Sequence, residues 1–239
     1  MTMPEDMGKT LLDIYSSLLK AYDPQHWWPA DEPFEVMVGA ILTQSTAWAN
    51  VEKAIKNLKA SQATSPAALR SLGLDELAAL VRPSGYYTAK AGKLKALVDW
   101  LEHHDDDLSR LSAQDTAQLR KELLAVYGIG EETADSILLY AIGKPVFVID
   151  AYTRRTIDRI GPHLLTSSPP AERKNTAGRT YADYQRLFTD NLPADVAMFN
   201  EYHALFVQHG KQTCRKTPLC PHCCLLDLCD YGRSHTPHT

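Results

Sequence analysis

Cysteine is absent from the chain as far as Thr213, and all five cysteines lie within the last 26 of the 239 residues. Long apolar runs are absent too, so no segment of the sequence is expected to cross a bilayer. The N-terminal stretch, residues 1–9, is polar and acidic and does not resemble a secretory signal. These absences predict a reducing compartment, where disulfides are rare and clustered cysteines are more often metal ligands.

An excess of basic residues is also lacking, since the net charge is −4. This value argues only weakly against a nucleic-acid partner, because local charge decides such contacts. Residues 1–32 hold 2 basic and 6 acidic side chains, whereas residues 146–239 hold 11 basic and 9 acidic ones. The hydrophobic share of 44% and the charged share of 23% are those of an ordinary globular protein.

Convincing strand patterns are missing, and helical periodicity runs through most of the chain. Apolar stripes predict helices over residues 11–19, 34–42, 51–58, 74–81, 89–103, 119–127 and 134–142. The apolar stretch 146–149 is too short and too isolated to predict a sheet. The sequence therefore predicts an all-α protein.

Four of the cysteines follow the pattern Cys214-x5-Cys220-x2-Cys223-x5-Cys229. Thiolates that converge on one centre bind zinc or an iron–sulfur cluster, and the spacing alone does not separate the two. Cys224 adds a second ambiguity, because it could replace Cys223 as the third ligand.

A glycine pair, Gly128-Ile129-Gly130, lies between two amphipathic helical segments. Two glycines this close allow a tight turn, with Ile129 inserted between the helices and backbone N–H groups exposed at the start of the second helix. Such a helix start can bind a phosphate without a basic side chain. Gly128, Ile129 and Gly130 are therefore candidate phosphate contacts, and an ordinary tight turn is the alternative; the family resemblance below implies that the phosphate belongs to DNA.

The segments 124–135 and 147–155, together with 42–46, 84–91 and the cysteine loop, resemble the helix–hairpin–helix DNA glycosylase superfamily. The resemblance spans nearly the whole chain in the right order. It implies two helical domains with the active-site cleft between them. One is a six-helix barrel over residues 35–145 that carries the hairpin. The other combines residues 1–34 and 146–239 and carries a [4Fe–4S] loop.

The resemblance assigns Asp150 as the catalytic carboxylate, which stabilises the oxocarbenium-like sugar and orients water. Asp also caps helices well, so capping residues 151–160 is the alternative role of Asp150, and the two roles are compatible. Members that also cleave the strand carry a lysine nucleophile in the hairpin helix, and this chain has Glu132 there. A glutamate forms no imine, which predicts a monofunctional enzyme. Lys90 and Lys144 are possible stand-ins.

Trp27, Trp28 and Pro29, followed by residues 34–46, resemble the 3-methyladenine DNA glycosylase III branch. A flipped base is held by stacking, and tryptophan faces attract a cationic alkylated purine. Anchoring the first helix is the alternative role of these tryptophans. Gln44, or Ser45 in an offset alignment, is the candidate wedge that fills the gap left by the base, and a helix cap is its alternative.

The cysteine pattern resembles the [4Fe–4S] loop of endonuclease III, although its first gap has five residues where the family usually has six. The resemblance implies Cys214, Cys220, Cys223 and Cys229 as ligands of the cluster. Nearby Lys211, Arg215 and Lys216 are candidate phosphate contacts. We expect a monomer that binds double-stranded DNA containing a damaged base, no membrane contact, and a cytoplasmic location, nucleoid-associated in a bacterium.

Alkylated purines, 3-methyladenine first, are thus the predicted substrates. Three alternatives remain open. An endonuclease III-like glycosylase and lyase on oxidised pyrimidines would need another amine nucleophile. A mismatch-directed glycosylase also fits a site without the hairpin lysine. A non-catalytic module that binds damaged DNA would not depend on Asp150.

Overall fold

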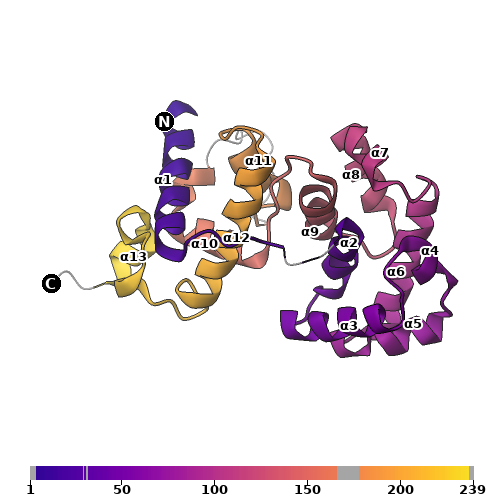
Figure 1. Ribbon diagram of the computed structural model, residues 1–239. Coiled ribbons are helices and arrows are strands. Elements are labelled where there is room, and N and C mark those ends of the chain that lie inside the picture. The colour runs from indigo at the N-terminus through magenta and orange to yellow at the C-terminus, as the bar shows by residue number, and fades with distance from the viewer. Residues whose placement is uncertain (1–3, 29, 31, 166–177, 237–239) are drawn as a thin grey trace. The chain divides into compact units, whose positions relative to one another are not determined.

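The computed structural model describes residues 4–28, 30, 32–165 and 178–236, and Figure 1 shows their helices as coiled ribbons. All regular structure in these ranges is helical, without a strand, which confirms the predicted all-α class. No helix in the described ranges has the length and apolar character of a bilayer span.

Two compact units make up the chain, and the first joins Met1–Trp27 to Pro145–Thr239. Its elements are α1 (Pro4–Tyr22), α10 (Ala151–Ile160), η3 (Pro162–Leu165), α11 (Tyr181–Thr189), α12 (Val196–Gln212), η5 (Cys220–His222), η6 (Leu226–Leu228) and α13 (Asp230–His235). Within this unit the N-terminal helix α1 lies beside α12 (Figure 1). The domain limits expected from the sequence stay a prediction.

The core of the first unit is aromatic. Leu11, Ile14 and Leu18 form the fully buried stripe of α1, and the hydroxyl of Tyr202 in α12 donates to the Leu11 carbonyl at 2.8 Å. Phe147 stacks on Phe188 with ring centroids 3.8 Å apart. The two rings are nearly parallel, and ring contacts of this kind contribute to the stability of an aromatic core. The hydrogen bond from Tyr202 to Leu11 holds α12 against α1.

The stretch from Phe147 to Ile149 is buried but has no strand partner. Buried backbone groups need hydrogen bonds, and α11 supplies them from its side chains. The Ile149 N–H donates to the Tyr181 hydroxyl at 3.1 Å, and Gln185 Nε2 donates to the Phe147 carbonyl at 2.8 Å. This clamp fixes the backbone directly before Asp150.

The second unit is Trp28–Lys144. Its elements are α2 (Pro33–Leu42), α3 (Trp48–Ala60), α4 (Pro66–Ser71), α5 (Leu74–Leu80), η1 (Arg82–Ser84), α6 (Tyr87–Glu102), α7 (Leu108–Ala113), α8 (Thr116–Ala125), α9 (Glu131–Ser136) and η2, a π-helical turn (Ile137–Ile142). All of α2 except Pro33 and Glu35 is buried. Helices α3, α6 and α9 and the turn η2 pack around α2, which is therefore the core of this unit.

The helices predicted from apolar periodicity are all present, and two short helices accompany them. The described part of this unit has eight α-helices, of which α4 and α7 each have only six residues and show no full period. Ser65 Oγ accepts from Ala68 N, and Asp107 Oδ1 accepts from Ser109 N, so each short helix starts at a side-chain cap.

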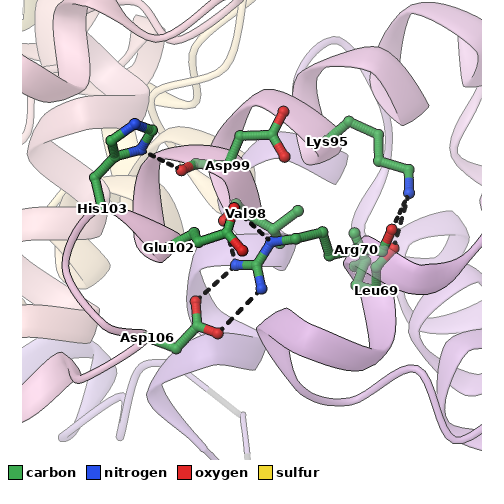
Figure 2. A network of polar contacts seen from close by, with 8 residues as sticks. All are labelled: Leu69, Arg70, Lys95, Val98, Asp99, Glu102, His103 and Asp106. Atoms are coloured by element: carbon green, nitrogen blue, oxygen red, sulfur yellow. Dashed lines mark hydrogen bonds and ion pairs between the residues drawn. The ribbon is translucent and has the colours of Figure 1, made fainter.

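Polar contacts also hold α4 against α6, as Figure 2 shows. The Arg70 guanidinium donates to both carboxylate oxygens of Asp106, at 2.7 and 3.2 Å, and to the Val98 carbonyl. Lys95 Nζ reaches back to the end of α4 and donates to the carbonyls of Leu69 and Arg70. These side chains satisfy the carbonyls that so short a helix leaves open.

Candidate active site and DNA-contact residues

Asp150 lies at the junction of the clamped extended stretch and α10, and only 11% of its side chain is exposed. Its Oδ1 accepts from the Thr153 N–H at 2.7 Å, which makes Asp150 the N-cap of α10. The capping role that the sequence offers as an alternative is thus present. One carboxylate oxygen is fixed by the cap, and the other, Oδ2, has a different neighbour.

That neighbour is His203 of α12, a residue the sequence analysis did not single out. Its Nε2 lies 3.8 Å from Asp150 Oδ2, and its side chain is 8% exposed. Burial lowers the pKa of His203 below its usual value, and the Asp150 carboxylate opposes that shift. The ring is therefore neutral at neutral pH.

The hairpin between α8 and α9 has the geometry expected of a glycine turn. Gly128 adopts a φ of +81°, a conformation that glycine takes without steric cost. The Ile129 side chain is buried, and its N–H donates to the Val126 carbonyl at 3.1 Å. Gly130 is the N-cap of α9. Ile129 therefore anchors the turn between the two helices.

A buried ion pair ties the two hairpin helices together. Arg120 of α8 donates from Nε and Nη2 to the two oxygens of Asp135 of α9, at 2.7 and 3.1 Å. The Asp135 side chain is completely buried. A two-point contact of this kind fixes relative orientation as well as distance.

Gln44 lies in the turn after α2 and contacts the hairpin directly. Its Nε2 donates to the Gly128 carbonyl at 3.1 Å and to Thr133 Oγ1 at 2.9 Å, while its Oε1 accepts from Lys93 Nζ at 2.5 Å. Ser45 is exposed at the tip of the turn with a φ of +54°. Gln44 braces the hairpin in this structure, and its role as a wedge stays a prediction, as does that of Ser45.

Neither candidate substitute lysine has a freely accessible amine. Lys90 is 2% exposed, and its Nζ donates to the carbonyls of Leu42 and Ser84 at 2.8 and 2.7 Å. Burial lowers its pKa to about 8. Lys144 Nζ donates to the carbonyls of Ser112 and Gln114. Glu132 is exposed in the first turn of α9.

The two tryptophans of the proposed base pocket belong to different units of the chain. Trp27, in the first unit, has Lys211 Nζ 5.5 Å from its ring centroid. Trp28, in the second, packs on α2 at Gly39, where an added Cβ would lie 3.1 Å from the ring. Pro29 lies outside the described residues.

Trp28 joins an aromatic cluster that the sequence analysis missed. Its ring centroid lies 5.3 Å from that of Trp48 and 5.4 Å from that of Tyr140. All three side chains are half-buried, and Tyr140 comes from the π-helical turn η2. Turns of this type occur often at functional sites. Only the three-dimensional fold brings these three positions together.

The cysteine loop forms one side of a small pocket with a cavity volume of about 20 Å³. Cys214, Cys220, Cys223 and Cys229 all line it, whereas Cys224 does not and is exposed. Burial raises the pKa of the Cys223 thiol to about 12 and also raises that of Cys229. Thiols in this state must lose their protons when they bind a metal.

The donor set of the pocket consists of thiols. In the described part of the chain, no three His, Cys, Asp or Glu side chains converge as a single metal ion requires. The four thiols nevertheless line the same pocket. A set of four thiols suits either a zinc ion or an iron–sulfur cluster.

Two arginines connect α10 to this loop. Arg155 donates to the carbonyls of Gly210 and Cys214, at 2.9 and 2.8 Å. Arg159 donates to Cys214 Sγ at 3.2 Å and to the carbonyls of Arg215 and Lys216. The helix that Asp150 caps is thereby fixed to the loop. The side chains of Lys211, Arg215 and Lys216 are exposed beside it.

The geometry agrees with the comparisons with known proteins. Residues 38–178 match the family described as HhH-GPD superfamily base excision DNA repair protein. A Methanocaldococcus jannaschii protein with the provisional name of a DNA repair glycosylase is 40% identical over 229 residues. The match covers 95% of this chain and 99% of the relative. The chain therefore belongs to the HhH-GPD superfamily of base excision DNA repair proteins and is a DNA glycosylase.

Solved structures share the fold. A non-covalent endonuclease III–DNA complex superimposes with a TM-score of 0.76 at 22% identity and covers 98% of both chains. The H. pylori 3-methyladenine DNA glycosylase (MagIII) bound to 1,N6-ethenoadenine gives 0.68 at 26% identity, covering 88% of this chain and 98% of the other. The first of these similarities shows the fold alone.

Proposed function

We propose that this protein is a monofunctional DNA glycosylase that hydrolyses the N-glycosidic bond of alkylated purines, 3-methyladenine first among them. The observation that carries the proposal is the buried Asp150, which caps α10. Glu132 stands where the family resemblance leads us to expect the lyase lysine, and this supports the absence of strand cleavage. A fixed carboxylate stabilises the sugar cation and orients water. Water is then the nucleophile, since Lys90 and Lys144 are both engaged with backbone carbonyls.

The aromatic side chains support an alkylated purine as the substrate. Trp28, Trp48 and Tyr140 form one cluster with electron-rich faces. A cationic base gains more from such faces than a neutral one does, and it is also the better leaving group. Similarity to the H. pylori 3-methyladenine glycosylase points the same way. We therefore assign base contact to the Trp28 cluster, with Trp27 and Pro29 as the further predicted members.

Double-stranded DNA with a damaged base is the proposed partner. The hairpin residues Gly128, Ile129 and Gly130 would bind a phosphate through backbone N–H groups. Tyr86 is 76% exposed and Tyr127, next to the hairpin, is 65% exposed. Exposed aromatic rings of this kind can stack on unpaired bases. Lys211, Arg215 and Lys216 would add phosphate contacts from the cysteine loop.

A [4Fe–4S] cluster held by Cys214, Cys220, Cys223 and Cys229 is the proposed cofactor. The shared cavity of the four thiols supports this ligand set, and the exposed position of Cys224 favours Cys223 as the third ligand. Such a cluster cross-links the loop. Hydrolysis of a glycosidic bond consumes no electrons, so we assign the cluster a structural role.

The test is to incubate the protein, with its cluster, with methylated duplex DNA and to measure free bases and strand breaks. We expect release of 3-methyladenine, with breaks only after hot alkali. Breaks without alkali, with a product trapped by borohydride, would instead identify an endonuclease III-like lyase. Release only from mispaired duplexes would identify a mismatch-directed glycosylase. Binding of damaged DNA without release of any base would leave a non-catalytic module.

A further inference from the structure

The two oxygens of the Asp150 carboxylate have different surroundings. Oδ1 is held by the Thr153 N–H at 2.7 Å, whereas Oδ2 lies 3.8 Å from His203 Nε2. A separation of 3.8 Å exceeds a hydrogen bond but is short for an electrostatic contact between two buried groups. Oδ2 is therefore the oxygen with freedom to serve a substrate, and His203 is the side chain beside it.

His203 is held firmly enough to act as a fixed neighbour. It lies in the middle of α12, which packs against both α10 and α1. The preceding residue, Tyr202, is fully buried, and its hydroxyl donates a hydrogen bond to the backbone of α1. A polar ring on such a rigid helix holds its position without reorganisation when charge develops nearby.

The charge state of the ring suits a carboxylate that must face a cation. Burial lowers the pKa of His203, and Asp150 is the charged group that opposes this shift. A permanent cation such as lysine at this place would neutralise Asp150 and weaken its attraction for a positively charged sugar. A neutral imidazole can orient the carboxylate and leaves its negative charge available.

We propose that His203 is a positioning residue that acts through Asp150: its neutral ring directs the Nε2 hydrogen toward Oδ2 and holds the carboxylate toward the sugar cation. This inference rests on the proposed function, because it takes Asp150 as the group that stabilises that cation. His203 itself touches no reacting atom. The role is one of orientation, so it must vanish when Asp150 loses its charge.

The test uses two abasic-site analogues in duplex DNA, a cationic pyrrolidine and a neutral tetrahydrofuran. Analogues that carry the transition-state charge bind more tightly than neutral ones. The ratio of the two dissociation constants therefore reports how well Asp150 faces a cation. We measure it in the wild type, in His203→Phe, in His203→Gln and in Asp150→Asn, with thermal melting as a check on folding.

We expect His203→Phe to lower the preference for the cationic analogue about tenfold, with tetrahydrofuran binding unchanged. His203→Gln keeps an amide donor and should restore most of the preference. His203→Phe should have no further effect in the Asp150→Asn background, as an action through Asp150 requires.

Three results would overturn parts of the account in distinguishable ways. A wild-type preference that survives in His203→Phe refutes the inference and leaves the proposed function intact. Equal loss of affinity for both analogues in both His203 variants means that His203 is only structural. A wild type without any preference for the cationic analogue contradicts the role of Asp150 itself, and with it the proposed function.

Discussion

Asp150 combines a structural and a chemical task in one side chain. As the N-cap of α10 it satisfies a backbone N–H through Oδ1, and as the proposed catalytic group it presents Oδ2. The cap fixes the side chain at the start of a helix, where the dipole favours a negative charge. Pre-organisation therefore comes from the same hydrogen bond that starts the helix.

Lys90 offers a direct test of the buried-amine geometry. Lys90→Met removes the donors for the carbonyls of Leu42 and Ser84, and we expect it to lower the free energy of unfolding by about 2 kcal/mol near neutral pH. Burial lowers the Lys90 pKa to about 8 from an ordinary value of 10.5. The unfolded chain thus binds more protons between these pH values, and the wild type gains stability as the pH rises through them.

The measurement is urea unfolding of wild type and Lys90→Met at about pH 7 and about pH 10. The wild type should gain stability relative to the variant at the higher pH. Lys53→Met, at an exposed lysine of α3, is the matched control. If wild type and Lys90→Met differ in their free energy of unfolding by the same amount at both pH values, Lys90 carries no buried charge.

Some residues of the candidate site can be predicted from the sequence, whereas others become evident only in the structure. Asp150 and the Gly128–Gly130 turn were identifiable because short motifs carry them. His203, Trp48 and Tyr140 were not, because each acquires its neighbour only when distant helices pack. Lys90 resembled a possible nucleophile in the sequence, and its carbonyl partners become visible only in the fold.

Among the elements, the hairpin offers a test at the Arg120–Asp135 pair, which joins its two helices. Arg120→Met leaves the buried Asp135 carboxylate without its guanidinium, and we expect destabilisation by about 3 kcal/mol in denaturant unfolding. The double variant Arg120→Met/Asp135→Asn removes the buried charge and should recover part of that loss. If the double variant is less stable than the single one, the pair does not explain the effect.

The cysteine loop provides an element-scale test with a built-in control. Cys223→Ser should abolish the cluster, measured as iron and sulfide per chain and as visible absorbance. Cys224→Ser, at the adjacent exposed position, should retain both. The opposite pattern would make Cys224 the third ligand. Retention of the cluster in both variants would mean that neither thiol is required.

Element length decided which helices could be predicted. The helices with an apolar stripe over two or more turns, such as α2 and α6, follow from periodicity alone. α4 and α7 have six residues each and depend on caps and on tertiary partners such as Lys95. The extended stretch before Asp150 shows the same limit, because α11 supplies its hydrogen bonds.

For the whole molecule, the net charge of −4 means that any phosphate contacts depend on local basic groups. We expect alanine at Lys211, Arg215 or Lys216 to reduce the slope of log affinity against log salt by about 0.9 each. Binding titrations over a potassium chloride series measure it. Lys20→Ala, an exposed lysine of α1, is the control and should leave the slope unchanged. Equal slopes in all variants would remove the loop from the DNA interface.

The most direct test of the account compares wild type and Asp150→Asn on methylated duplex DNA, under single-turnover conditions and with DNA binding measured in parallel. Asparagine still caps a helix, so folding and binding should persist. We predict that release of 3-methyladenine falls at least about a hundredfold, because the charge that stabilises the sugar cation is lost. Release at the wild-type rate by Asp150→Asn would contradict the central claim.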